Sequence, residues 1–329
     1  MKKNNASAKF AKIMGSYGMI LILLLLIVCF AVSIPQGRFL SASNIFNVLR
    51  QVSIVGIIAV GMTFIMLTGG IDLSCGSVAG FAGVGAALLM TKYTMNPVLA
   101  ALLMCVLGAA FGMVNGLFIS KLDVPPFIAT LGMMVSIRGL AYIITGGLPV
   151  FGFDKNFTKL GQGYLGPIPI PIPVIIMVIV FILGAFFLAK TKAGRHIYGV
   201  GGKEEASRLS GVNITKIKLL VYSVGGLCSA LGGLVMLART NSGQPNGGEG
   251  YEMDVVTAVV LGGISMNGGQ GRIGMVIVGV LIMGILSNGM TMLGINEFVQ
   301  KFVRGLVLIG AVALNNFIKK KNEKTTSAN

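Results

Sequence analysis

The sequence predicts an all-α polytopic membrane protein, and three observations carry this prediction. Hydrophobic residues make up 54% of the 329 residues and charged residues only 11%, whereas a soluble domain carries roughly a quarter charged residues. The apolar segments are too long and too uniformly apolar for a membrane β-barrel, whose strands alternate over about ten residues. The 48 glycines suit helices that pack closely in lipid through small residues.

The distribution of charge narrows the class further. The formal charge of +16 is concentrated in the two tails, at the ends of apolar segments and in one internal polar segment. That is the positive-inside pattern of membrane proteins, so we expect contact with membrane lipid and no nucleic-acid partner. Cys29, Cys75, Cys105 and Cys228 show no CxxC or Cys/His spacing, so neither a disulfide framework nor a metal site is predicted.

The first half of the chain divides into apolar segments with short polar connections. Residues 1–16 form a basic arm, and the apolar residues 17–34 can cross a bilayer. No A-x-A site follows them, so we expect a membrane helix rather than a cleaved leader. An external segment at 37–47 precedes further expected helices, which cover residues 52–68, 97–120 and 127–145.

Two short apolar segments stand beside glycine-rich breaks. The motif GGIDLSCG (69–76) precedes residues 77–90, and SMNGGQGRIG (265–274) follows residues 255–264. Both segments are too short to cross about 30 Å of hydrocarbon, so we expect half-helices whose irregular backbone is covered by protein or lines a cavity. Gly-Gly-Ile ends a helix in both places, a weak repeat that glycine-rich membrane sequence also produces by chance.

The second half of the chain follows the same pattern. An external segment at 146–168 leads through alternating prolines to an apolar segment that ends at Ala189. A polar segment at 190–218 and an external polar segment at 239–254 are also expected. The remaining helices are expected over residues 219–238, 273–293 and 298–317.

This division gives about ten crossings, two of them short or broken, with both termini and residues 190–218 on the cytoplasmic side. That side then holds 17 Lys and Arg against seven on the other side, in accord with the positive-inside rule. The predicted organisation is a cytoplasmic arm at 1–16, a transmembrane domain at 17–318 and a basic cytoplasmic tail at 319–329.

The polar segment 190–218 is the longest interruption of the apolar pattern. It holds seven basic residues and the chain's one histidine, His196. Residues 204–209 are rich in helix formers, and Gly211 stands where a helix C-terminal glycine would. We interpret this stretch as a short exposed helix against which another protein docks. A solvated loop that only sets the membrane topology is the alternative interpretation.

Motifs for catalysis are not found. The sequence has no GxxxxGK[ST] phosphate loop and no HExxH, and its one histidine lies in the polar segment. Asp72 is the only acid within the expected apolar portion; it could serve ion-coupled transport or simply accept hydrogen bonds in its turn. Arg138, in the middle of an apolar segment, could line a pathway or brace the structure. We therefore expect a transport protein and not an enzyme.

Four blocks carry a family resemblance that covers nearly the whole chain. They are AVGMTFIMLTGGIDLSCGSVAG (59–80), PPFIATLGMMVSIRGL (125–140), GRHIYGVGGKEEASRLSGVNITKIK (194–218) and GYEMDVVTAVVLGGISMNGGQGRIGMVIVG (250–279). In this order they resemble the membrane permease of bacterial ABC importers for simple sugars, the ribose/galactoside/xylose class. The stretch from Glu205 to Gly211 also resembles the general permease pattern E-A-A-x-x-x-G, with Ser207 in place of the second alanine.

The resemblance implies a type II ABC importer-like permease in the bacterial plasma (inner) membrane. It implies a homodimer of permeases, a cytoplasmic ABC ATPase that uses ATP-Mg, an external or periplasmic sugar-binding protein, and a monosaccharide substrate, with ribose favoured. No cofactor is expected in this chain. The ATPase is expected to dock on Glu204, Glu205, Ala206, Ser207, Arg208, Leu209 and Gly211.

The transport pathway is less well marked. Polarity and position suggest Thr68, Asp72, Ser74, Asn115 and Arg138 as pathway residues. One alternative is an ABC permease for a nucleoside, an autoinducer sugar or a branched-chain amino acid. An ion-coupled secondary carrier or channel, which needs no ATPase, is another. A neighbouring gene for an ATPase with a phosphate loop would separate these alternatives.

Overall fold

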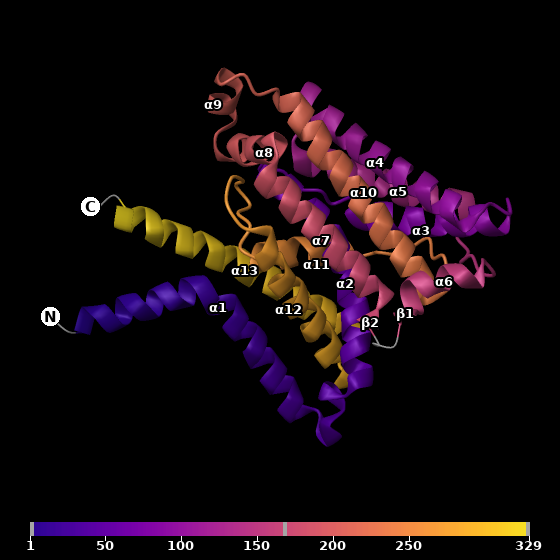
Figure 1. Cartoon of the computed structure of the whole chain (residues 1–329), viewed down its shortest axis with the longest axis horizontal. Helices are drawn as coiled ribbons and strands as arrows, with labels where there is room; N and C mark the ends of the chain where they lie inside the picture. The colour runs from indigo at the N-terminus through magenta and orange to yellow at the C-terminus, as the bar shows by residue number, and fades with distance from the viewer. Residues whose placement is uncertain (1–2, 167–169, 327–329) are drawn as a thin grey trace.

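The structure is a computed structural model that describes residues 3–166 and 170–326, with side chains described for 18–166 and 170–313. Most of the described chain is helical (Figure 1). A two-residue antiparallel pair, β1 (Tyr164–Leu165) and β2 (Ile170–Pro171), is the only sheet in the described part. The helices are α1 (Lys3–Ser33), η1 (Pro35–Leu40), α2 (Ala42–Leu67), α3 (Cys75–Thr91), α4 (Pro97–Lys121), α5 (Pro126–Thr145), α6 (Lys155–Gln162), α7 (Ile172–Lys190), α8 (Lys192–Gly202), α9 (Glu204–Leu209), α10 (Ile214–Thr240), α11 (Tyr251–Leu261), α12 (Ile273–Met292) and α13 (Glu297–Thr326).

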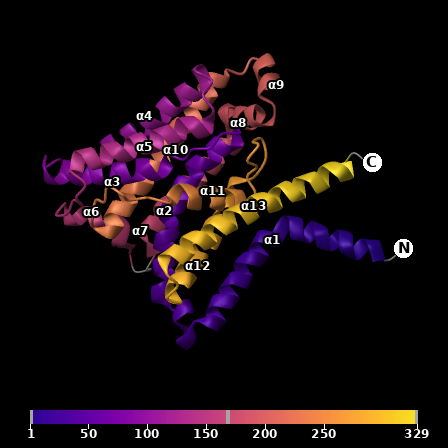
Figure 2. The same cartoon turned by 180° about the vertical axis from the view of Figure 1, so that it is seen from behind.

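Length and composition confirm a polytopic helical membrane fold. Six described helices are long and apolar enough to cross a bilayer, namely α2, α4, α5, α7, α10 and α12. The part of α1 from Gly18 to Ser33 and the whole of α3 are shorter apolar helices. The start of α1 and the end of α13 lie toward the side of the molecule that carries α9, and α6 lies toward the opposite side, in both views (Figures 1 and 2). We name these the α9 side and the α6 side.

Several boundaries differ from those expected. Residues 42–47, expected in an external segment, are helical because Ser41 begins α2: its hydroxyl accepts the N–H of Asn44 at 3.3 Å. The segment 146–168 contains α6, and Asp154 caps this helix through the N–H of Asn156 at 2.7 Å. Of the alternating prolines, Pro167 and Pro169 lie outside the described residues.

Helix α10 is the centre of the fold, packing most extensively on α4 and then on α2 and α3. Glycines make this close approach possible. Gly108, Gly112 and Gly116 recur every fourth residue along α4, and a Cβ on any of them would meet the backbone of α10. Such small-residue stripes let helices in lipid approach to backbone contact, so α4 and α10 form a rigid pair.

The largest departure from the expected topology concerns residues 239–254, expected to be an external polar segment. The chain leaves α10 beside α6, where Gln162 donates to the carbonyl of Arg239 at 3.0 Å. It then runs along α3 toward that helix's start: Gly243 lies against Val84, and Gly248 lies against Gly76. The segment therefore re-enters the molecule, and α11 begins beside the start of α3 rather than at the surface.

This re-entry is tolerated because protein covers the irregular backbone. The 17 residues of α3 rise about 25 Å, so the start of α11 is separated from the α6 side by most of that distance. Both half-helices, α3 and α11, thus begin inside the protein at one level. This is the arrangement expected of discontinuous transporter helices.

Candidate functional site

The predicted docking segment forms an exposed helix. Helix α9 covers Glu204–Leu209, as expected, and contains no buried residue. Leu209 is 86% exposed, an unusual position for a large apolar side chain. Glu204 pairs with Arg208 at 3.2 Å and with Lys218 of α10 at 2.9 Å, and these contacts tether α9 to the membrane helix behind it. The predicted docking residues thus lie together on an accessible surface.

Gly211 ends this segment with the predicted geometry. Its φ is +82°, a left-handed conformation that favours glycine. Its N–H donates to the carbonyl of Arg208 at 3.0 Å, and the N–H of Val212 donates to the carbonyl of Ser207 at 3.0 Å. The helix C-terminus is therefore closed by backbone hydrogen bonds of the kind that glycine permits.

Below α9, the end of α8 meets both glycine-rich breaks. We name this contact the glycine junction: Leu67 and Gly69 at the end of α2, Gly201 in α8, and Gly268 and Gly269 in the α11–α12 connection. The N–H of Gly269 donates to the carbonyl of Leu67 at 2.9 Å. A Cβ on Gly201 would collide with that same carbonyl and would lie 2.5 Å from the nitrogen of Gly269. Three separate segments are thus in backbone contact.

Two tyrosines join the helices around the glycine junction to the breaks. Tyr198 of α8 donates its hydroxyl to the carbonyl of Gly271 at 3.1 Å, and Tyr222 of α10 donates to the carbonyl of Ile71 at 3.2 Å. Each break therefore receives a side-chain hydrogen bond from a neighbouring helix. Through Gly201 and Tyr198, α8 contacts the α11–α12 connection, and through Gly201 it also contacts the end of α2.

The two breaks end their helices with the same geometry. Gly69 and Gly263 have φ of +78° and +79°. Each donates its N–H to the carbonyl three residues earlier at 2.9 Å, and the next residue donates to the carbonyl five residues earlier at 3.2 Å. Both helices therefore end in the same way, but the equivalent positions are one residue out of step with the two Gly-Gly-Ile triplets, so the sequence repeat and the structural repeat are not in register.

Three of the predicted pathway residues lie together. Ser74 donates its N–H and its hydroxyl to the Asp72 carboxylate at 2.8 Å and 2.6 Å, and Asn115 donates to the Ser74 hydroxyl at 3.0 Å. Thr68 donates to the carbonyl of Ile65 in its own helix at 2.8 Å. These four residues are buried. Asp72 has no ion-pair partner in the described part of the chain.

Arg138, the fifth predicted pathway residue, lies elsewhere and holds the re-entrant segment. Its guanidinium donates to the carbonyls of Pro245 and Gly247 at 2.9 Å and 2.6 Å. These carbonyls would otherwise be left without donors inside the membrane. The charge is accommodated because the irregular backbone of residues 241–250 needs donors, and this contact fixes the path of that segment.

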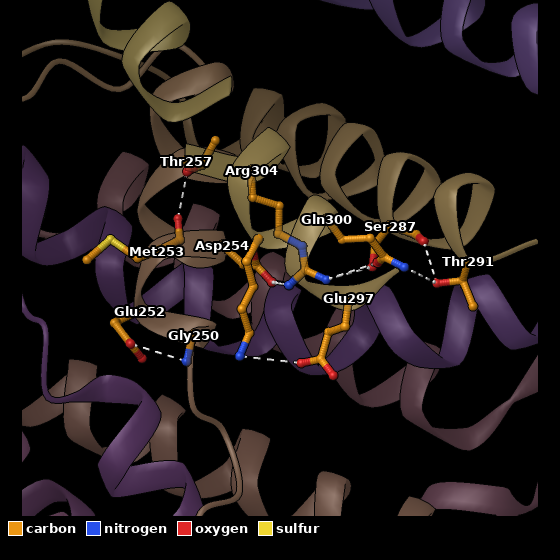
Figure 3. A network of polar contacts seen from close by, with 11 residues as sticks. Gly250, Glu252, Met253, Asp254, Thr257, Ser287, Thr291, Glu297, Gln300 and Arg304 are labelled. Carbon is orange, nitrogen blue, oxygen red and sulfur yellow. Dashed lines mark hydrogen bonds and ion pairs between the residues drawn. The ribbon is translucent and has the colours of Figure 1, made fainter. Parts of the chain in front are cut away.

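A polar cavity of about 680 Å³ opens between the re-entrant segment, the start of α11 and the first turns of α13. Hydroxyl, amide and charged side chains line much of it. These are Thr240, Ser242, Gln244, Asn246, Glu249, Glu252, Asp254, Glu297, Lys301 and Arg304. Glu252 accepts the N–H of Gly250 at 3.2 Å (Figure 3), and a Cβ on Gly76 would meet its carboxylate. The cavity therefore reaches the starts of both half-helices.

Two ion pairs lie in the cavity wall. Arg304 of α13 pairs with Asp254 of α11 at 3.2 Å and reaches the Ser287 hydroxyl of α12 at 3.3 Å (Figure 3). Lys301 pairs with Glu297 at 3.4 Å within α13. The first pair ties three helices together at the start of α11.

Glu252, Asp254 and Arg304, which line the polar cavity, are not among the pathway residues that the sequence predicts. Glu252 and Asp254 belong to residues 239–254, for which the sequence predicts an external segment. One signal was available: Glu252 and Asp254 directly precede an apolar segment that is too short to span the membrane, and Arg304 lies within the last apolar segment. Charged residues within or beside membrane segments usually pair with a residue of opposite charge, so an ion pair between one of these acids and Arg304 could be expected.

Comparison with known proteins identifies the family. Residues 44–312 match the family described as branched-chain amino acid transport system / permease component. The chain belongs to this permease family. The permease is 43% identical to the ribose import permease protein of Escherichia coli (strain K12) over 294 residues, which cover 89% of this chain and 91% of that protein. It is 45% identical to the ribose import permease protein of Bacillus subtilis (strain 168) over 310 residues, covering 93% and 94%.

A more distant relative is named for a different sugar. The permease is 35% identical to the galactose/methyl galactoside import permease protein of Escherichia coli (strain K12) over 326 residues, which cover 93% of this chain and 95% of that protein. No solved structure matches the chain significantly. The resemblance to sugar-importer permeases that the four sequence blocks predict is confirmed.

Proposed function

We propose that this chain is the membrane-spanning permease of an ATP-driven importer that translocates a monosaccharide, with ribose favoured, into the cytoplasm. As a member of a transport-permease family, it is a transport subunit and not an enzyme. The names of its relatives support the sugar class: those at 43% and 45% identity are ribose import permeases.

The observation that carries the mechanism is the exposed helix α9 above the glycine junction. A partner ATPase that docks on Glu204, Glu205, Ala206, Ser207, Arg208, Leu209 and Gly211 would move α8 together with α9. Because Gly201 of α8 is in backbone contact with both breaks, that movement would reach α3 and α11. ATP-Mg would be bound and hydrolysed on the partner, since the sequence has no phosphate loop.

The same proposal orients the chain in a bacterial inner membrane. The α9 side would be cytoplasmic and the α6 side external, with both termini cytoplasmic. Ten apolar helices, with α3 and α11 as the short ones, would form a type II importer-like domain over 17–318 between a basic arm at 1–16 and a basic tail at 319–329. A second permease copy, surrounding membrane lipid and an external or periplasmic sugar-binding protein would complete the assembly.

A transporter for an anionic or zwitterionic solute is less well supported. Among the described residues that line the polar cavity, four are acids and two, Lys301 and Arg304, are cations. An amino-acid carboxylate would therefore enter a lining with an excess of negative charge. Asp72, the residue on which an ion-coupled carrier would depend, lies in a buried cluster with Ser74 and Asn115, and it is not among the cavity residues.

The test is ATPase activity and ribose uptake of the co-purified complex in lipid, with and without ribose-loaded binding protein. The charge reversal Glu205→Lys should abolish stimulation and uptake, because it changes the surface where the ATPase docks. The Glu205 side chain forms no hydrogen bond or ion pair with other described residues, so its replacement should not disturb the fold. His196→Ala, an exposed change on α8, is the matched control and should retain both activities. Normal uptake by the Glu205→Lys complex would contradict the coupling assignment.

A further inference from the structure

The polar cavity has a size and a lining that suit a small ligand. Its volume of about 680 Å³ lies within the range of about 300–1,000 Å³ typical of small-molecule sites. Two segments that are far apart in the sequence build it: residues 236–254, which include the first turn of α11, and residues 297–308 of α13. Met236, Met253 and Leu308 add apolar surface between its polar groups.

The cavity extends along the re-entrant segment. Its walls follow the re-entrant segment from Ser242 to Gly250, and that segment runs along α3 to the start of the helix. The cavity thus connects the α6 side with the level at which α3 and α11 begin. Two helix N-termini meet there beside Glu252, and their partial positive charge favours a carboxylate at that position.

The free hydrogen-bonding groups of the lining define the ligand class. Lys301 and Arg304 are held by Glu297 and Asp254. In contrast, the side chains of Glu249 and Asn246 form no hydrogen bond with other described residues, and Glu252 accepts only a single backbone N–H. Carboxylates have several acceptor sites each. The lining holds four carboxylates and two cations, so the cavity offers surplus acceptors for O–H donors and disfavours an anion.

We propose that this cavity is the sugar site of the permease, in which Glu249, Glu252 and Asn246 bind the hydroxyl groups of a neutral monosaccharide that arrives from the α6 side. This assignment rests on the proposed function. The carboxylates accept from sugar hydroxyls, the amide of Asn246 donates and accepts, and the apolar side chains contact the C–H surface of the sugar. The pair Asp254–Arg304 lies in the wall and holds α11 against α13 while the site is occupied.

Transport by the reconstituted complex tests the site. The double variant Glu249→Gln/Glu252→Gln keeps the shape of the lining but removes both charged acceptors. Uptake of radiolabelled ribose into proteoliposomes should fall by about tenfold or more, since a hydrogen bond to a charged group contributes about 1.5–3 kcal/mol. ATPase stimulation by the loaded binding protein should remain, because the docking surface on α9 is unchanged.

The control variant is Asp154→Asn, which removes a carboxylate outside the cavity on the same side and keeps the cap of α6, since asparagine also caps helices. Its uptake should equal that of the unmodified complex. Unchanged uptake in the double variant would overturn the proposal. If the double variant does not assemble with the ATPase, Glu249→Gln alone gives the answer, because the Glu249 side chain is exposed and its removal breaks no hydrogen bond of the described chain.

A second measurement needs no ATPase and separates this proposal from the proposed function. In the permease alone, Gln244→Cys places a thiol in the cavity and keeps the three proposed sugar ligands, and a membrane-impermeant thiol reagent should modify it. Neutral ribose, arabinose or galactose at high millimolar concentration should slow the modification, and the sugar acid glucuronate should not. Equal rates with and without neutral sugars, or equal protection by glucuronate, would overturn the sugar site. Protection without ATP-driven uptake in the reconstituted complex would instead refute the proposed function.

Discussion

The glycine junction and the polar cavity lie at opposite ends of α11 (Tyr251–Leu261), and they differ in charge and in packing. The glycine junction contains no charged residue and is tightly packed. Its segments are in backbone contact, and a Cβ on Gly201 would collide with the carbonyl of Leu67. The polar cavity has about 680 Å³ of space and is lined by charged side chains. The difference suggests that one end transmits displacement and the other end responds to it.

The physical basis of this division is packing. Well-packed contacts change between discrete arrangements rather than deforming continuously, so a junction without voids transfers motion with little loss. A cavity held by ion pairs and hydrogen bonds can open and close at modest cost, because water or a sugar hydroxyl replaces each broken contact. A substitution in one of these two regions should leave the other intact.

The largest effect is expected for Gly201→Ala. The added methyl group would have to displace the end of α2 or the α11–α12 connection, and overpacking of this kind costs about 1–3 kcal/mol. Because these are the segments that carry the motion, ribose uptake by the reconstituted complex should be abolished while the ATPase still co-purifies.

The neighbouring residue provides the control for this prediction. A Cβ on Gly202 would meet nothing within 4 Å, so Gly202→Ala should transport normally. If both variants lost uptake equally, the loss would not result from the contact of Gly201 with the two breaks, and the prediction would be wrong.

A smaller effect is expected from the ion pair in the cavity wall. Asp254→Asn leaves the partly buried Arg304 without its carboxylate, and the free energy of unfolding should fall by about 1–3 kcal/mol. The double variant Asp254→Asn/Arg304→Gln should recover part of this loss, which thermal unfolding in detergent would measure as a coupling energy. Additive losses would indicate that the pair contributes nothing to the closed wall.

The smallest effect is expected for Tyr198→Phe. It removes one hydrogen bond, from the tyrosine hydroxyl to the carbonyl of Gly271, which contributes about 1 kcal/mol. Uptake should continue, and the number of ATP molecules hydrolysed per ribose should rise by about twofold, because part of the motion of α8 no longer reaches the α11–α12 connection. Tyr142→Phe, whose hydroxyl forms no hydrogen bond in the described chain, should leave this ratio unchanged.

The sequence predicts much of the polar segment 190–218 and less of the cavity, for physical reasons. Helix α9 and Gly211 could be predicted because they depend on local signals: helix propensity and the conformational freedom of glycine. The apolar segments could be predicted because a bilayer demands a minimum length. These features require no knowledge of which segments lie beside one another.

The re-entrant segment could not be predicted in this way. Residues 239–254 are polar, and polar segments between membrane helices usually lie outside the membrane. Their actual position depends on contacts that are distant in the sequence: Arg138 donates to Pro245 and Gly247, and Gly76 and Gly80 admit the backbone of Gly248 and Gly247. No periodicity encodes such pairs. The predicted pathway residues Asp72, Ser74 and Asn115 do form a cluster, but its part in transport stays a prediction.

In the proposed mechanism, motion at α9 reaches the polar cavity through the glycine junction. The direct measurement is the rate at which an impermeant thiol reagent modifies Asn246→Cys in the assembled complex, with and without ATP and vanadate. Nucleotide should change this rate in the otherwise unmodified complex, and adding Gly201→Ala should remove the change while the ATPase remains bound. A nucleotide-dependent change that persists in the Gly201→Ala complex would contradict it.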